Sequence, residues 1–180
     1  MNKPIVALIS VLAVLAPIKG SLAANGLLQE VKLGVLQHDV DGMWSGFRRE
    51  SGYDFNVEVV LQPSVSFGPG TVRPAIGLSM NDSSGTNRFY VDARWELETT
   101  SKFRPSIGLG VAAHDGEIRS PDRQHKSLGA DLLFHIPVEF IYRVDTHHAV
   151  SVYFDHVSNG SLGDPNEGLD SLGLRYGYRY

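Results

Sequence analysis

The sequence predicts an all-β protein, an eight-stranded antiparallel transmembrane β-barrel of a bacterial outer membrane. Three observations predict this fold. Apolar and polar residues alternate with a period of two along most of the chain, the pattern of strands with two unlike faces. The alternating segments are roughly ten residues long, as tilted transmembrane strands are. Short and longer polar connections alternate between them, like the periplasmic turns and extracellular loops of such barrels.

Eight segments carry the alternation. They are residues 31–35, 53–61, 76–80, 89–97, 103–111, 128–142, 150–154 and 172–180. The last segment ends in alternating tyrosines and looks like the aromatic-ended final strand of outer-membrane barrels. Charged residues fall opposite the apolar faces and predict an ion-paired interior; they are Asp54, Glu58, Asp92, Arg94, Glu96, Asp131, Glu139, Arg175 and Arg179. A soluble lipocalin-like barrel, whose apolar faces would point inward, is the alternative fold.

The connections separate the two ends of the predicted barrel. Residues 68–71, 99–102 and 145–148 are short, whereas residues 39–52, 81–87, 114–126 and 159–169 are mostly longer and polar. Pro137 interrupts the longest alternating segment. Because proline cannot donate a ladder hydrogen bond, it predicts either a bulge or an extension of that strand beyond the membrane.

The N-terminus has the features of a cleavable signal peptide spanning residues 1–23, which leaves residues 24–180 as one barrel domain. Lys3 precedes an apolar run over residues 5–16, and Ser21-Leu22-Ala23 ends in small residues. Removing Lys3 and Lys19 takes the net charge from −4 to −6, and no basic cluster remains to indicate nucleic-acid binding. The chain has no cysteine, which excludes disulfides and a thiol nucleophile.

One short stretch, residues 156–170, contains the three residue types that acyl transfer by a serine requires. A serine nucleophile needs an imidazole base, and the imidazole needs an acid to orient it. His156 and Ser158 continue the lipid-facing register of residues 150–154, and Asp170 continues that of the last segment. The three side chains should therefore meet on the outer wall at the extracellular rim. The alternative is that they only mark the edge of the membrane.

A serine esterase in that position would receive its substrate laterally, with acyl chains in the bilayer and an ester at the headgroup boundary. In the outer membrane the extracellular leaflet is lipopolysaccharide, so lipid A is the nearest ester. Phospholipase activity on the same scaffold is the enzymatic alternative, and a small structural or adhesive barrel is the non-enzymatic one. The sequence is silent on oligomeric state, so a homodimer stays open.

The stretch resembles the outer-membrane lipid A 3-O-deacylases of the PagL type. The resemblance implies an eight-stranded barrel that hydrolyses the 3-position acyl ester of lipid A without a metal or other cofactor. It also implies that Ser158 is the nucleophile, His156 the general base and Asp170 the orienting acid. The matching residues are His156-Val-Ser158-Asn159-Gly160, Asn166, Gly168-Leu169 and the acid at position 170.

The chain departs from that family at the acid, which is usually glutamate; Glu167 is a nearby rival to Asp170. Asn159 and Gly160 are candidates to stabilise an oxyanion through backbone N–H groups, and Asn166 through its amide. Outer-membrane phospholipases A also resemble the His-x-Ser-Asn-Gly core, but they have twelve strands, an asparagine as third member and a calcium requirement. Trp44 and Phe47 could contact lipid or sugars, or simply pack the first long loop.

Overall fold

The computed structural model describes residues 26–180, and the predicted signal peptide at residues 1–23 lies outside the described residues. Its strands are β1 (Leu28–Gln37), β2 (Tyr53–Leu61), β3 (Val65–Phe67), β4 (Gly70–Asn81), β5 (Arg88–Leu97), β6 (Phe103–His114), β7 (Leu132–Arg143), β8 (His148–Ser158) and β9 (Leu169–Arg179). No helix in this part of the chain is long and apolar enough to cross a membrane.

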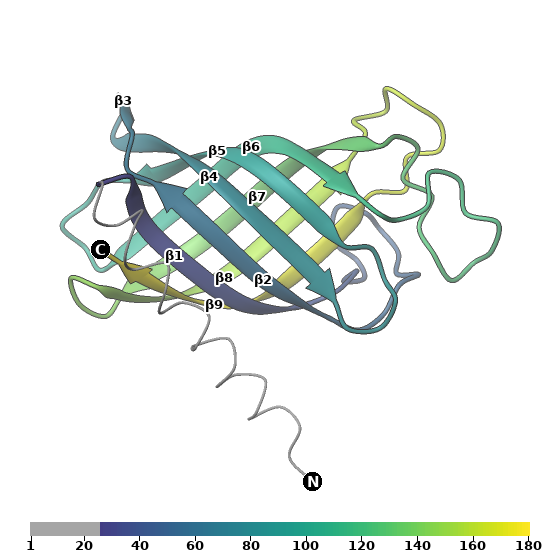
Figure 1. Ribbon diagram of the computed structural model, residues 1–180, viewed down its shortest axis with the longest axis horizontal. Coiled ribbons are helices and arrows are strands. Elements are labelled where there is room, and N and C mark those ends of the chain that lie inside the picture. Colours follow the sequence, from purple (N-terminus) through teal and green to yellow (C-terminus); the bar gives the residue numbers. More distant parts are fainter. Residues whose placement is uncertain (1–25) are drawn as a thin grey trace, which may run out of the picture.

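The strands form a closed antiparallel barrel (Figure 1). Strands that are neighbours in sequence pair, except β2 and β3; in addition β1 pairs with β9, and β2 pairs with β4. This confirms the predicted eight-stranded barrel. The three-residue β3 was not predicted; it pairs with β4 and lies outside the ring, so the connection at residues 62–69 is a small hairpin rather than a bare turn.

The two ends of the barrel differ as the sequence predicted. The longer loops at residues 38–52, 82–87, 115–131 and 159–168 gather at the end drawn on the right in Figure 1. The hairpin of β3, the turns at residues 98–102 and 144–147, and the C-terminus lie at the other end. We call the four longer connections loops 1 to 4.

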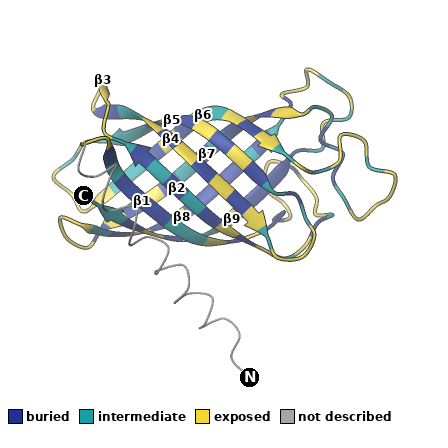
Figure 2. Ribbon diagram, in the orientation of Figure 1, coloured by how far each residue is buried: buried dark blue, intermediate teal, exposed yellow. Residues whose placement is uncertain are grey.

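Exposed and buried residues alternate along the strands (Figure 2). The exposed set forms an apolar outer belt that includes Val91, Leu109, Phe140, Val152 and Leu174. The inward set is rich in charged residues, among them Glu58, Arg94 and Glu139. Such a belt around a polar interior is the arrangement of a barrel that faces lipid.

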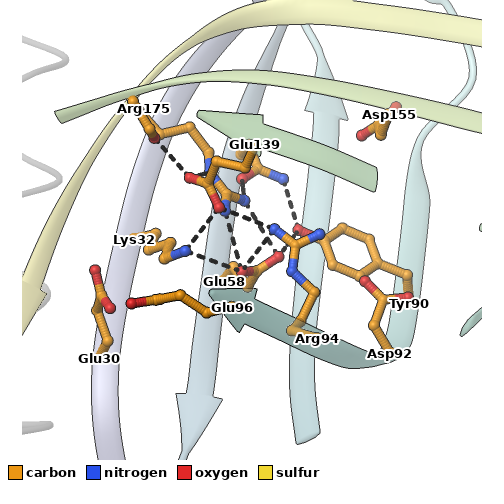
Figure 3. Close-up of polar contacts among 12 residues, drawn as sticks. Glu30, Lys32, Glu58, Tyr90, Asp92, Arg94, Glu96, Glu139, Asp155 and Arg175 are labelled. Carbon is orange, nitrogen blue, oxygen red and sulfur yellow. Dashed lines mark hydrogen bonds and ion pairs between the residues drawn. The ribbon is translucent and has the colours of Figure 1, made fainter. Parts of the chain in front are cut away.

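The lumen is filled by an ion-paired network (Figure 3). One Glu139 oxygen accepts hydrogen bonds from Lys32 at 2.7 Å, from Arg175 at 2.8 Å and from Arg94 at 3.0 Å. Glu58 pairs with the same arginine, Arg175, at 3.1 Å. The predicted ion-paired interior is thus present, with one error: Asp131 is exposed, because it precedes β7 instead of lying within it.

The segment predicted as one strand over residues 128–142 begins as a strand only at Leu132. Leu128 is fully buried in an apolar cluster at the loop end of the lumen, with Tyr90, Leu133 and Val157. Its backbone N–H donates to Glu117 within loop 3 at 2.9 Å. Burial of an apolar side chain inside the barrel therefore outweighs continuation of the strand pattern.

Pro137 neither creates a bulge nor marks an extension beyond the barrel wall. The β6–β7 ladder has no pairs between Ile107–Val138 and Gly110–His135, yet its register is the same on both sides of the gap. A Cβ atom on Gly108 would lie 2.7 Å from Pro137 Cγ. The proline therefore removes ladder pairs locally, and a facing glycine makes room for its ring.

Candidate active site

The ladder between β8 and β9 brings the three predicted catalytic residues together on the outer wall. His156 and Asp170 are direct cross-strand partners, and Ser158 is the last residue of β8. Their neighbours Val157, Leu169 and Ser171 point into the lumen, where they are buried. The period-two register therefore places the three side chains on the outer face, at the end that carries the long loops.

The three side chains form a continuous hydrogen-bonded chain. His156 Nδ1 lies 2.6 Å from Asp170 Oδ1, and His156 Nε2 lies 3.0 Å from Ser158 Oγ. An ionised carboxylate only accepts hydrogen bonds, so Nδ1 carries the hydrogen and Nε2 is left to accept from the serine hydroxyl. The Asp170 side chain is fully buried, and that of His156 is 12% exposed.

Loop 1 folds over this chain, which the sequence did not predict. The Ser45 backbone N–H donates to Asp170 Oδ2 at 2.6 Å, so both carboxylate oxygens are engaged. The Trp44 ring packs edge-on against His156 and Phe154, with both ring-centroid distances at 5.3 Å. Phe154, predicted to face lipid, is consequently only 9% exposed.

Two glutamates, the buried Glu50 and the partly exposed Glu167, connect the loops. Glu50 of loop 1 accepts from His38, from the Thr86 backbone of loop 2 and from the Lys126 backbone of loop 3. Glu167 of loop 4 accepts from Arg49 at 2.8 Å and from the Ser127 backbone N–H at 2.7 Å. Asp170, and not its rival Glu167, contacts His156.

An open cleft of about 310 Å³ lies above Ser158 and His156, between loops 1 and 4. One wall consists of Trp44, Ser45 and Phe47, and the other wall of residues 164–168. A hydroxyl with an accepting imidazole in such a cleft is the arrangement that nucleophilic acyl transfer requires.

The sequence of residues 25–179 matches the family described as "Lipid A 3-O-deacylase (PagL)". The chain belongs to this family. Family membership and the apolar outer belt identify it as an outer-membrane barrel, as its sequence predicted.

Two solved structures are similar to this chain in fold. The crystal structure of the outer membrane enzyme PagL has 21% sequence identity and a TM-score of 0.60, covering 84% of this chain and 99% of that one. The N-terminal β-barrel domain of Pseudomonas aeruginosa OprF has 13% identity and a TM-score of 0.55, covering 86% and 99%. The curated proteins contain no significant match.

The residues proposed for oxyanion stabilisation are separated in this deacylase-family member. Asn166 lines the cleft, whereas Asn159 and Gly160 are not among its lining residues. The Asn159 N–H donates to Asn166 Oδ1 at 3.0 Å, and its side-chain amide donates to carbonyls that include Leu128 O and Pro165 O. In this arrangement Asn159 shapes loop 4, and its N–H is occupied.

Sequence reasoning missed the contact of Ser45, and it named Gly168 only as part of the family resemblance. Ser45 acts through its backbone, and no side-chain pattern reveals such a contact. Gly168 has a positive φ of 59°, and a Cβ atom there would lie 3.2 Å from His156 Cε1. The sequence held only indirect signals. Aromatic residues in a polar loop flank Ser45, and Gly168 lies two residues before Asp170.

Proposed function

We propose that this protein is a serine esterase that hydrolyses the ester-linked 3-O-acyl chain of lipid A through Ser158, His156 and Asp170. The observation that carries the proposal is the chain of hydrogen bonds of 2.6 and 3.0 Å from Asp170 through His156 to Ser158 on the outer wall. Family membership supports the substrate and the 3-position.

In the first half-reaction, Ser158 Oγ attacks the ester carbonyl while His156 Nε2 takes the hydroxyl proton. Asp170, already accepting from Nδ1, stabilises the imidazolium that forms. The tetrahedral intermediate then collapses, and His156 returns the proton to the departing sugar oxygen. The product of this step is an acyl ester on Ser158.

In the second half-reaction, water takes the place of the sugar hydroxyl. His156 removes a proton from the water as the water attacks the acyl-enzyme carbonyl, and then protonates Ser158 Oγ as the fatty acid leaves. The Asn166 amide, which lines the cleft, is the donor that we assign to the developing oxyanion. Asn159 would contribute only if its N–H exchanged its Asn166 partner for the oxyanion, and the Gly160 N–H is the remaining backbone candidate.

The location of the site supports lipid A as substrate. The cleft lies on the outer wall at the end with the long loops, so a lipid ester can enter laterally without leaving the bilayer. The loops are extracellular in barrels of this kind, and the adjoining leaflet is lipopolysaccharide.

Purified protein in detergent micelles tests this proposal. Wild type should release a 3-hydroxy fatty acid from lipid A, and Ser158→Ala should release none while keeping the heat-modifiable migration of a folded barrel. Chelation of calcium should leave the rate unchanged. Release from phospholipids instead, with loss of activity on chelation, would favour the phospholipase alternative; activity in Ser158→Ala would remove the serine assignment.

A further inference from the structure

The cleft has two chemically different walls. Loop 4 contributes a polar wall that includes Asp164, Asn166 and Glu167, whereas loop 1 contributes the rings of Trp44 and Phe47. An ester between a sugar and a fatty acid has the same two-sided character. Apolar surface favours contact with the hydrocarbon, and polar groups need hydrogen-bonding partners. The sugar therefore suits the loop 4 wall and the acyl chain the loop 1 wall.

Of the two aromatic rings, Trp44 is the more exposed, at 57% against 43% for Phe47. The Phe47 ring lies beneath cations, with Lys126 Nζ at 4.2 Å and the Arg49 guanidinium carbon at 5.1 Å from its centroid. The Trp44 ring contacts the rings of Phe154 and His156, and more than half of the Trp44 surface is still exposed. It therefore presents a large apolar surface beside the proposed base.

Trp44 also lies on the path from Ser158 to the bilayer. The outward residues of β8 run from Ser158 through His156 and Phe154 to Val152, which is 47% exposed to lipid. Phe154 lies about 13 Å from Ser158 along the strand, at about 3.3 Å per residue. A chain esterified to Ser158 and directed along this row into the membrane must pass the surface that Trp44 covers.

We propose that Trp44 determines acyl-chain selectivity, by forming the wall against which the carbonyl-proximal half of the scissile chain lies. The inference rests on the proposed esterase function and names the part of the cleft that receives the fatty acid. The competing path runs over β7, where Phe134 is the cross-strand partner of Ser158 and is 42% exposed.

A kinetic comparison tests this assignment. The ratio of kcat/KM for a 12-carbon over a 4-carbon 4-nitrophenyl ester should fall about tenfold in Trp44→Ala, because the short chain ends before it gains much contact with the indole. If Trp44→Ala also disturbs His156, the hydrolysis of both esters slows by the same factor, and this effect cancels in the ratio. Phe140→Ala, a lipid-facing aromatic far along β7, is the matched control and should keep the wild-type ratio. An unchanged ratio in Trp44→Ala, or a larger fall in Phe134→Ala, would overturn the proposal.

A covalent probe tests the contact directly, whatever the activity of Trp44→Ala. Trp95 is the other tryptophan of the chain, so Trp95→Phe leaves Trp44 as the only indole. A long-chain alkyl fluorophosphonate forms a bond from Ser158 Oγ to phosphorus and expels fluoride, with the hydroxyl proton passing to His156. Bromine atoms on the half of the chain nearest phosphorus should quench Trp44 fluorescence at least twofold, relative to the same probe without bromine.

Peptide mass analysis separates the two levels of failure. Suppose that both probes have added their mass to the Ser158 peptide. Equal Trp44 fluorescence with the two probes would then overturn the role of Trp44, while the proposed esterase function would stand. Absence of that mass from the Ser158 peptide would overturn the proposed nucleophile, and this inference with it.

Discussion

At the scale of single residues, the proposed chemistry depends on which carboxylate orients His156. Asp170 contacts the imidazole at 2.6 Å, while Glu167 is engaged by Arg49 and the Ser127 backbone. Asp170 and Glu167 are only three residues apart in sequence, so chain order alone does not show which of them orients His156. The ladder does, because His156 and Asp170 are cross-strand partners and Glu167 belongs to the loop.

Exchange of each acid for its amide should separate the two roles. Asp170→Asn should lower kcat by about 10²–10⁴-fold, because the amide cannot stabilise the imidazolium and favours the wrong imidazole tautomer. Glu167→Gln should cost less than about tenfold, because it weakens a partly exposed pair between loops. Rates of lipid A hydrolysis by the two purified variants measure the ranking, and the reverse order would move the orienting role to Glu167.

Gly168 provides a second residue-scale prediction. Its φ is positive, and a Cβ atom would approach His156 Cε1 to 3.2 Å and Val157 O to 3.2 Å. Gly168→Ala should therefore lower kcat by roughly tenfold, with about 1–2 kcal/mol of backbone strain in this left-handed conformation. Gly42→Ala is the matched control, since that glycine also has positive φ but no atom within 4 Å of the added Cβ. Equal kcat values for the two variants would contradict the close packing proposed around His156.

At the scale of elements, loop 1 has two tasks: it completes the partners of Asp170 and forms one wall of the cleft. Its own anchor is Glu50, which is 2% exposed. Burial would raise the pKa of the Glu50 carboxyl, but hydrogen bonds from His38 and from the backbone N–H groups of Lys126 and Thr86 outweigh it and lower the pKa to about 2. The charged form of Glu50 therefore stabilises the docked loop.

The lowered pKa of Glu50 predicts that loop 1 undocks from the barrel at acidic pH. A carboxyl whose pKa falls from 4.5 in the free state to about 2 when docked stabilises docking above pH 4.5. That stabilisation, about 3 kcal/mol, is lost as the pH falls from 4.5 to 2. In the Trp95→Phe background, Trp44 fluorescence should change over this range, and in Glu50→Gln the transition should disappear. A transition of the same size and midpoint in Glu50→Gln would exclude Glu50 as the anchor.

The sequence predicted strands well and loops poorly, for a physical reason. Strand periodicity reports which face each residue occupies, so it placed His156, Ser158 and Asp170 on one face. The contacts of loop 1 depend on a backbone N–H, that of Ser45, and on folding back over β8, neither of which leaves a periodic signal. Leu128 was misplaced for the same reason: its apolar character fits both a strand and the lumen cluster.

At the scale of the whole molecule, the lumen network makes the barrel a rigid support for a site on its outside. Glu139 is fully buried and is shared by Lys32, Arg94 and Arg175. The cations come from β1, β5 and β9, so a single carboxylate on β7 links strands around the ring. Ser151 on β8 also donates to Glu139, at 2.6 Å, so β8 and β9, which carry the proposed catalytic residues, are held through the interior as well as through their ladder.

Removal of this shared charge should destabilise the whole barrel. Glu139→Gln leaves three buried cations with less compensation, and breaking a buried ion pair costs about 3–5 kcal/mol. The temperature at which the folded band converts to the unfolded band in heat-modifiability gels should fall. Glu117→Gln, at an exposed loop position, makes the same change of charge and should leave that temperature unchanged. Equal conversion temperatures would show that the network does not hold the barrel together.

The most direct test of the central claim is mass spectrometry of lipid A from cells that express wild type or Ser158→Ala. We predict that wild type removes one 3-hydroxyacyl chain from lipid A, and that Ser158→Ala, folded and present at the same level in the outer membrane, removes none. Loss of the chain with both proteins would contradict Ser158 as nucleophile, and intact lipid A with both would contradict lipid A as substrate.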